Sequence, residues 1–445
     1  MKSKSIFLLL LYFLFLSSCR KSNYEVPYEE VIIYNGAGTG TVTWTSDQDY
    51  VLEGLVFVNE GQTLTIEPGT VIRAKTGQAE NASALIVARG GKIIAQGTAT
   101  NPIIFTVEGD NLKGSIPIES QGLWGGLILL GNAPLNVSGN EAIIEGIPIN
   151  EPRGLYGGDD PDDNSGILQY VSIRHGGTNI GEGNEINGLT LGGVGSGTTI
   201  DHIEVISNAD DGIEFFGGTV NCKYIAVAYC GDDAFDFDMG YQGKGQYWLA
   251  IQGENQGNLV AELDGSPSHP SAKPYTMPQI YNLTALGHGT SKAGELISFR
   301  TNAAGSFINS IFVNQENGIE LEYNKETSNS LEQWQRGNIK LEGNTFFNIA
   351  NNEAQHIFKI TGDEPETSVQ NEWQNYFESA SNLVANPNFI ALDPPYNLYP
   401  TSELSSPVIP GDDFFDQVDY RGAFKNQNWL LGWSLLSREG IIDMP

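Results

Sequence analysis

The chain has 445 residues and a formal net charge of −31, because 54 acidic side chains outnumber 23 basic ones. Such an acidic balance argues against nucleic acid and anionic surfaces as partners, and it fits solubility outside a cell or the binding of cations. The few cysteines and histidines show no spacing typical of zinc sites. The length fits one large domain.

The N-terminus has the pattern of a secretion signal. Lys2 and Lys4 precede an apolar run over residues 6–16, too short for a membrane span, and the sequence LSSC then ends at Cys19. This pattern resembles a bacterial lipoprotein signal with its lipobox. The resemblance implies that residues 1–19 form a signal peptide cleaved before Cys19, which then carries lipid and anchors the protein in the outer membrane. Residues 20–30 read as a flexible tether, the face of the membrane stays open, and an ordinary secretory signal is the alternative.

The mature chain opens with short strand-like phrases. GQTLTIEPGTVI and GKIIAQGTATNPIIFT alternate apolar and polar residues between Gly and Pro corners. They resemble the first coils of right-handed parallel β-helix proteins of the pectin-lyase-like superfamily. Nearly the whole chain is also similar to a family of uncharacterised lipoproteins from Bacteroidetes-type bacteria. The resemblance implies an all-β parallel β-helix solenoid over residues 31–445, with loop insertions, and it carries no activity with it.

The clearest internal repeat covers residues 199–240. Its two halves align at a period of about 22 residues, so that Ile213 falls on Phe235 and Phe215 on Phe237. A period of this length with alternating short strands predicts stacked coils, with these four side chains facing inward. Cys222 and Cys230 lie in one coil and are expected to be small core residues, although a disulfide is the alternative.

The same register predicts two outward columns of side chains. One column runs through Thr190, Glu214, Asp236, Ser298, Glu320 and Lys359, and its neighbour runs through Gly192, Phe216, Asp238, Arg300, Glu322 and Thr361. Stacked carboxylates repel one another, so water, a shared proton or a bridging cation must relieve them. A calcium site would use Asp210, Asp232, Glu214 and Asp236. The alternatives are charge ladders, in which Arg300 and Lys359 offset neighbouring acids, and Asp residues that bond the backbone at corners.

A second acidic stretch is the loop GLYGGDDPDDNSG. Its four aspartates at positions 159, 160, 162 and 163 indicate either a solvated loop or a cation site. The spacing lacks the alternating ligands and closing Glu of an EF-hand.

Some of these acids also resemble the motifs of polygalacturonases, which are β-helix glycosidases. In those enzymes N-x-D is followed one coil later by D-D, and then by G-H-G and R-x-K. The resemblance implies a catalytic set that pairs carboxylates with a histidine and an arginine, namely Asp211, Asp232, Asp233, His288 and Arg300. His288 lies more than two periods beyond Asp233 where the family has one coil, and no Lys follows Arg300.

The later part of the chain reads as insertions and an end cap. Aromatic residues in insertions at 241–279, 323–340 and 362–385 suggest a sugar-stacking platform formed by Tyr247, Trp248 and Trp334, with edge packing as the alternative. VQNEWQNYFESASNL has helical spacing. The aromatic segment 400–445 is expected to cap the last coil.

Two hypotheses for function follow. The leading one is a non-enzymatic envelope lipoprotein that binds a glycan or another envelope protein, with calcium as its only candidate cofactor. The alternative is a glycoside hydrolase acting on an acidic polysaccharide through the stacked aspartates.

Overall fold

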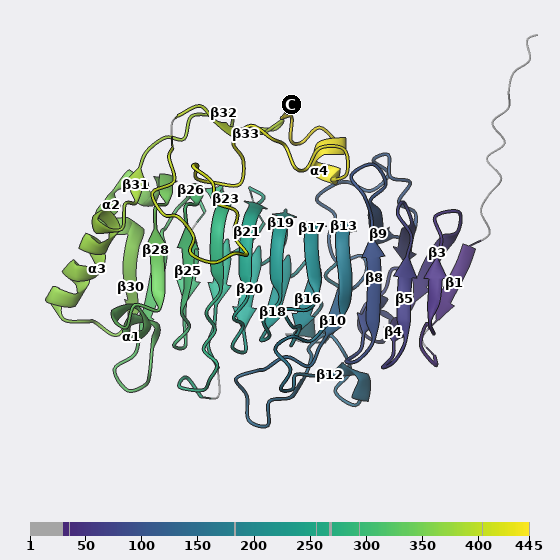
Figure 1. The fold of residues 1–445 in the computed structure, drawn as a ribbon. Helices are drawn as coiled ribbons and strands as arrows, with labels where there is room; N and C mark the ends of the chain where they lie inside the picture. Colours follow the sequence, from purple (N-terminus) through teal and green to yellow (C-terminus); the bar gives the residue numbers. More distant parts are fainter. Residues whose placement is uncertain are drawn as a thin grey trace, which may run out of the picture.

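The computed structural model describes residues 30–444 except 35, 182–183, 255, 267–268, 293 and 403. The predicted signal peptide with Cys19 and most of the predicted tether lie outside these residues. The described chain winds into stacked coils, seen as successive parallel strands along the long axis in Figure 1. The predicted parallel β-helix is confirmed.

Two long parallel sheets, called sheet A and sheet B, form the walls of the β-helix. Sheet B contains β4 (Leu55–Val58), β7 (Ala84–Val87), β10 (Leu127–Leu130), β16 (Leu189–Gly192), β18 (Ile213–Phe216), β20 (Phe235–Asp238), β22 (Ala261–Leu263), β24 (Ile297–Phe299), β27 (Ile319–Tyr323) and β30 (Phe358–Gly362). Sheet A contains β1 (Glu30–Tyr34), β2 (Val42–Trp44), β3 (Asp49–Glu53), β5 (Thr63–Ile66), β6 (Val71–Ala74), β8 (Lys92–Gln96), β9 (Ile103–Val107), β13 (Gly166–Arg174), β17 (Thr199–Ile206), β19 (Asn221–Ala228), β21 (Lys244–Ile251), β23 (Gln279–Gly289), β25 (Gly305–Ile308), β26 (Ile311–Gln315), β28 (Ile339–Glu342), β29 (Thr345–Ile349) and β31 (Leu383–Val384).

The remaining elements are short pairs and helices on the outside. The antiparallel pairs are β11 (Ala142–Ile143) with β12 (Leu155–Tyr156), β14 (Asn179–Gly181) with β15 (Asn184–Glu185), and β32 (Phe389–Ala391) with β33 (Asn397–Pro400). The helices are α1 (Ser330–Gln335), α2 (Ala354–Ile357), α3 (Thr367–Ser379) and α4 (Leu435–Arg438), with 3₁₀ turns at Ala79–Asn81, Pro152–Gly154 and Ala350–Asn352. In the described part of the chain, we find no helix with the length and apolarity needed to span a bilayer.

The predicted register of the repeat is confirmed in both sheets. Ile213 pairs with Phe235 and Phe215 with Phe237, and all four side chains are buried in the core. The rings of Phe215 and Phe237 stack with centroids 5.1 Å apart. Apolar residues at one position of each coil therefore form continuous internal stacks, and their burial stabilises the solenoid.

The expected insertion at 241–279 is largely wrong, because it contains two strands of the β-helix. β21 pairs with β19 in sheet A, and β22 pairs with β20 in sheet B. Glu262 therefore stands between Asp236 and Ser298 in the outward column. The repeat hides this coil because its spacing lengthens from 22 residues, between Asp211 and Asp233, to 26 residues, between Asp233 and Leu259.

The two cysteines are confirmed as buried free thiols of the core. At the C-terminal end of the core the predicted helix is present as α3. Trp373 of α3 stacks on Phe358 with ring centroids 4.7 Å apart, and Phe377 packs beside it. Helix α3 therefore covers the last apolar coil. Residues 400–445, which were expected to do so, have a different role.

The segment after residue 385, which we call the strap, runs back along the outside of sheet A. Figure 1 shows it in yellow above the strands, reaching α4 near β13. Trp433, Leu436 and Phe424 pack there on the outward apolar residues Ile206, Ala226, Ala228, Leu249 and Ile251. The expectation that residues 400–445 cap the last coil is corrected, because these aromatic residues cover one flank of sheet A.

Candidate functional site

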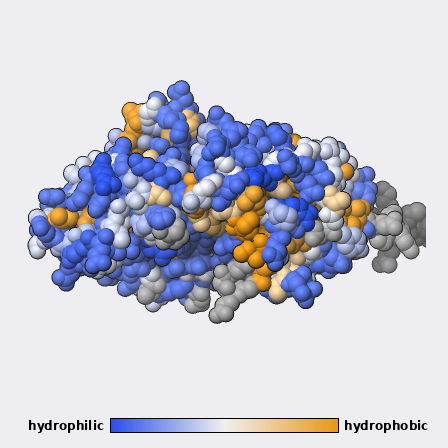
Figure 2. Space-filling view, turned by 90° about the horizontal axis from the view of Figure 1, so that it is seen from below, coloured by the Kyte–Doolittle hydropathy of each residue, from blue (hydrophilic) through white to orange (hydrophobic). Residues whose placement is uncertain are grey.

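The outward face of sheet B changes character along the solenoid. Its first outward residues are apolar, namely Phe57, Ile86 and Ile128, and residues of the long connection between β10 and β13 pack on them. After Thr190 the same column becomes acidic, with Glu214, Asp236 and Glu262 on successive coils. Hydrophilic residues cover most of the molecular face in Figure 2, interrupted by one larger apolar area and several smaller ones.

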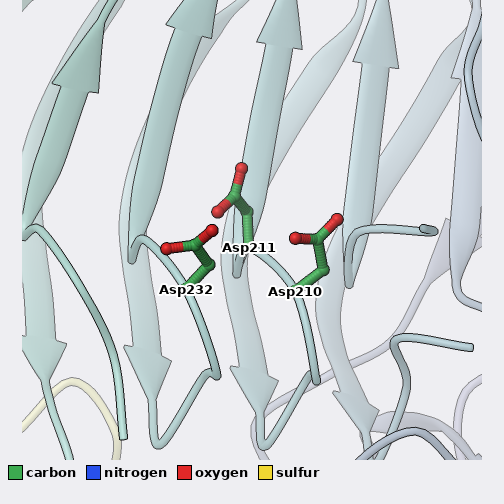
Figure 3. A group of neighbouring side chains, drawn as sticks. All are labelled: Asp210, Asp211 and Asp232. Atoms are coloured by element: carbon green, nitrogen blue, oxygen red, sulfur yellow. The ribbon is translucent and has the colours of Figure 1, made fainter. Parts of the chain in front are cut away.

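We use the name acidic ladder for seven carboxylates on three successive coils, namely Asp210, Asp211, Glu214, Asp232, Asp233, Asp236 and Glu262. Figure 3 shows Asp210 and Asp211 at one corner and Asp232 at the corner of the next coil. Oxygens of these three residues lie within 4.8 Å of one another, and so do oxygens of Asp211, Glu214 and Asp236. Asp211 therefore belongs to two overlapping groups of three carboxylates, each close enough together to share a cation.

Two carboxylates of the ladder bond the backbone of the following coil. Asp211 Oδ1 accepts a hydrogen bond from the Asp233 amide at 2.8 Å, and Asp233 Oδ1 accepts one from the Leu259 amide at 2.6 Å. The alternative in which the aspartates bond the backbone of their own corner holds for Asp210, which is hydrogen-bonded to the Asp211 backbone, whereas Asp211 and Asp233 link their coil to the next. One carboxylate oxygen of Asp211 and one of Asp233 are thereby hydrogen-bonded to the backbone, and the second oxygen of each can bind another partner.

The ladder is electrostatically crowded. Burial, followed by repulsion from Glu145, raises the pKa of Asp210 to about 7. Burial and neighbouring carboxylates also raise the pKa of Asp238 and of Glu262 to about 7. For Asp211, Glu214, Asp233 and Asp236 the same two causes raise the pKa well above the usual range. Without protons or cations the ladder would hold mutually repelling charges.

Polar partners from the connection between β10 and β16 reach only part of the ladder. The buried Asn187 amide donates to Glu214 and, at 3.4 Å, to Glu145. Glu214 and Asp236 also form a hydrogen bond between their carboxyl groups, which requires a proton on one of them. The buried Oδ1 of Asp236 has no hydrogen-bond partner among the described residues. This oxygen is free to bind a cation.

The basic residues occupy the predicted columns, although their ion-pair partners include acids that the prediction did not name. Arg300 forms ion pairs with Glu262 and with Asp264, the latter at 2.5 Å, because the coil that the repeat missed places Asp264 between Asp238 and Arg300 in the column. Lys359 pairs in register with Glu320, as predicted, and also forms an ion pair with Glu295 at 3.6 Å. Arg300 therefore offsets charge at the Glu262 end of the ladder only.

The predicted catalytic set does not assemble around the aspartates. His288 ends β23, two coils beyond β19, whose coil carries Asp232 and Asp233. Its ring Nε2 lies 2.9 Å from the Gln315 amide nitrogen, and its pKa is lowered by burial and by Lys292. Arg300 follows β24, two coils beyond β20, and is held by Glu262 and Asp264.

The three residues of the predicted aromatic platform lie in different places. Trp248 is fully buried and stacks against Phe215, Phe235 and Phe237, so its expected role in sugar stacking is corrected to core packing. Trp334 is half-buried and meets Trp373 edge-on. Tyr247, the residue directly before Trp248 in β21, lines a cavity described below.

The aspartate-rich loop bonds within the protein. Asp163 accepts hydrogen bonds from Asn132 at 3.0 Å and from Ser165 at 3.1 Å. Asp162 accepts one from Ser196 at 2.7 Å. These contacts favour an internally bonded loop over the cation site.

Sequence reasoning missed Glu145, Asn187 and Glu262 as members or neighbours of the ladder. Glu262 was hidden by the lengthened coil. Glu145 lies in the irregular connection between β10 and β13, and Asn187 comes just before β16. An apolar-acid-apolar triplet, present in Ala261-Glu262-Leu263 as in Phe235-Asp236-Phe237, is the signal that identifies the missing coil.

Comparison with known proteins gives one informative result. No curated protein and no solved structure matches the chain. A family model described as a pectate-lyase-like β-helix domain matches residues 36–386, which include every coil that carries the acidic ladder. The chain therefore belongs to the family of pectate-lyase-like β-helix domains.

Proposed function

We propose that this protein is a non-catalytic binding module of a bacterial cell envelope and that its acidic ladder holds a calcium ion. The observation that carries the proposal is the pair of overlapping carboxylate groups that share Asp211. Calcium takes six to eight oxygen ligands in flexible geometry, whereas magnesium demands a near-ideal octahedron and keeps several waters. A ladder of carboxylates from separate coils suits the larger and more tolerant ion.

Access to the ladder is from the corner. Asp232 is exposed and Asp210 is half-buried, while Asp211 and Glu214 lie deeper. An ion entering past Asp232 would meet Asp210 and Asp211 first, and would displace the protons that their raised pKa values retain near neutrality. Calcium binding is therefore expected to release protons.

Catalysis by the polygalacturonase-like set is the weaker candidate. Asp211 and Asp233 each bond a backbone amide, and His288 and Arg300 bond other partners. A glycosidase needs one carboxyl group to protonate the leaving oxygen and a second to activate water or attack the sugar. In its favour, Asp210 has a pKa of about 7 beside the exposed Asp232, which is the combination of acid and base that such an enzyme would use.

Calorimetric titration of the purified protein with calcium chloride tests the proposal. We expect saturable binding, with the enthalpy depending on buffer ionisation because protons are released. Asp232→Asn is expected to weaken binding by at least about tenfold, since it removes a charged ligand. Glu372→Gln, on the exposed face of α3, is the charge-matched control and should bind as the parent does.

Two results would contradict this proposal. One is the absence of saturable binding, or equal weakening in Asp232→Asn and Glu372→Gln. The other is release of reducing sugar from polygalacturonate that Asp232→Asn abolishes, which would establish the hydrolase instead.

The envelope location rests on the N-terminal signal. Lipid on Cys19 would hold the β-helix at the outer membrane through the polar tether of residues 20–30, since stable anchoring by acyl chains needs more than one. Cys19→Ser is expected to move the protein from the membrane fraction to the soluble fraction, with loss of incorporated radiolabelled palmitate. Retention of the variant in the membrane fraction would argue against the anchor.

A further inference from the structure

A cavity of about 690 Å³ lies between sheet A and the strap, on a different sheet from the acidic ladder. The β-helix contributes Tyr170, His202, Tyr224 and Tyr247, and the strap contributes aromatic and amide side chains. The volume lies within the ~300–1,000 Å³ typical of small-ligand sites. The cavity is therefore large enough to hold a ligand of several rings.

The four β-helix residues, which we call the aromatic ladder, stack on one another. Ring centroids are 4.3 Å apart for Tyr170 and His202, 4.4 Å for His202 and Tyr224, and 5.0 Å for Tyr224 and Tyr247. The planes of the four rings are nearly parallel, so the rings stack face to face and their edges, not their faces, point away from the sheet. The tyrosine hydroxyls therefore follow one another at the spacing of the coils.

The backbone at this ladder is strained. Each residue sits at the bend of a sheet A strand with positive φ, at 50° for Tyr170, 57° for Tyr224 and 61° for Tyr247. The next positions in the same column are Asn282 and Asn309, and Asn tolerates this conformation better than tyrosine does. Bulky rings at left-handed positions cost stability, which points to a use for the rings beyond making the turn.

The strap provides the opposite wall. Trp429 meets His202 edge-on with centroids 6.2 Å apart and lies 5.7 Å from Tyr224. Asn426 and Gln427 are exposed at the same cavity. No hydrogen bond links the side-chain amide of Asn426 or Gln427, or the hydroxyl of Tyr170 or Tyr224, to another described residue. The cavity thus combines aromatic walls with unused donors and acceptors.

The charges at the cavity are already paired. Asp416 lies 2.9 Å from Lys223, and Lys425 forms an ion pair with Asp419. Burial raises the pKa of the Tyr224 hydroxyl to about 12, so it remains a donor at physiological pH. A ligand recognised here would be uncharged, partly apolar and rich in hydroxyl groups, which is the chemistry of a neutral sugar.

We propose that the cavity between the aromatic ladder and the strap binds a neutral oligosaccharide. The inference rests on the proposed binding function and names its ligand class and its site. It is independent of calcium, because no residue of the acidic ladder lines the cavity. The competing explanation is that the ladder serves only to pack the strap. Trp429 and Trp433 do contact it, but that packing leaves the cavity and its amide groups unused.

Calorimetry with cellohexaose, maltohexaose and mannohexaose tests the proposal, with hexagalacturonate as the charged comparison and EDTA present throughout. At least one neutral probe is expected to bind more tightly than hexagalacturonate. Tyr224→Phe and Gln427→Ala each remove one hydrogen-bonding group and are expected to weaken that binding by about fivefold. Tyr224→Phe keeps the ring stack, and Gln427 is exposed, so neither variant should impair folding.

Gln374→Ala is the matched control, because Gln374 is an amide residue at a different cavity, near α3. It should bind the neutral probe as the parent does. The proposal is overturned if no neutral hexasaccharide binds, if hexagalacturonate binds best, or if the two cavity variants bind as tightly as Gln374→Ala. Sugar binding that all three variants retain would overturn this site but leave the proposed non-catalytic binding function standing.

Discussion

At pH 7.5, a saturating concentration of calcium is expected to raise the melting temperature by about 5 °C or more, and the gain should disappear near pH 4.5. A ligand present at a hundredfold excess over its Kd stabilises the folded state by about 3 kcal/mol. The gain should depend on pH because the proposed site would bind calcium through ionised carboxylates of the acidic ladder, and at low pH protons would occupy them.

Without calcium, stability is expected to fall as the pH rises from about 4 to about 7. The pKa values of Asp210, Asp238 and Glu262 are raised to about 7 in the folded state, above those of free carboxyl groups. The folded protein therefore binds more protons than the unfolded chain across this interval. Stability decreases with pH wherever the folded state holds the extra protons. Glu151, whose pKa the Arg153 hydrogen bond lowers, contributes with the opposite sign at the acidic end.

Differential scanning calorimetry from pH 4.5 to 8, with calcium or with EDTA, measures both effects. Asp236→Asn removes one charge from the ladder and is expected to flatten the decline in EDTA and to reduce the calcium shift. Glu372→Gln removes one charge from an exposed position and should leave both unchanged. Stability that rises with pH in EDTA, or an equal calcium shift in both variants, would mean that the ladder is neither repulsive nor a cation site.

The sequence alone reveals the β-helix because its coils repeat where nothing interrupts them. Ile213 over Phe235 and Phe215 over Phe237 were predictable, since alternation fixes which side chains face inward and the unbroken period fixes the partner. Glu262 was not predictable by the same route, because its coil is lengthened and a fixed period skips it. The same lengthening concealed that Trp248 belongs to an inward position opposite Ile225.

The candidate site was only partly predictable for a related reason. Stacking of Asp210 and Asp211 with Asp232 follows directly from the repeat, and the structure brings them within 4.8 Å together with their neighbours. The positions of His288 and Arg300 depend on how many coils intervene, which spacing does not reveal when coil lengths vary. The position of Asn187 beside Glu214 depends on an irregular connection without periodicity.

The position of the strap could not be predicted from the sequence, for a different reason. An aromatic end segment indicates that some apolar surface is covered, and composition does not say which surface. A signal was present in sheet A, where Ile206, Ala228 and Ile251 are apolar on the outward face as well. Strands that are apolar on both faces are covered on both faces. Glu204 is the exception within this outward face, and its burial identifies where the strap attaches.

Glu204→Ala is expected to lower the free energy of unfolding by about 3–5 kcal/mol, the cost of breaking a buried charged network. Glu204 is fully buried and accepts hydrogen bonds from the Ser172 hydroxyl at 2.6 Å and from the Leu435 and Leu436 amides at 2.8 and 3.0 Å. Its charge also acts on the buried Arg174, whose pKa is lowered by burial. Alanine would leave two amides of the strap without an acceptor and Arg174 without the largest of its compensating charges, since only Asp110 and Glu439 would remain.

Urea denaturation with limited proteolysis measures this effect and locates it. Glu204→Ala should unfold at lower urea and should be cut first within the strap, because the lost acceptors tether residues 435–436 to β17. Glu204→Gln keeps one acceptor oxygen and should lose less stability than alanine. Two results would contradict this prediction: Glu204→Ala as stable as the parent, or first cuts in the coils rather than in the strap. Either would mean that apolar packing around Trp433 alone holds the strap and that the buried carboxylate has another role.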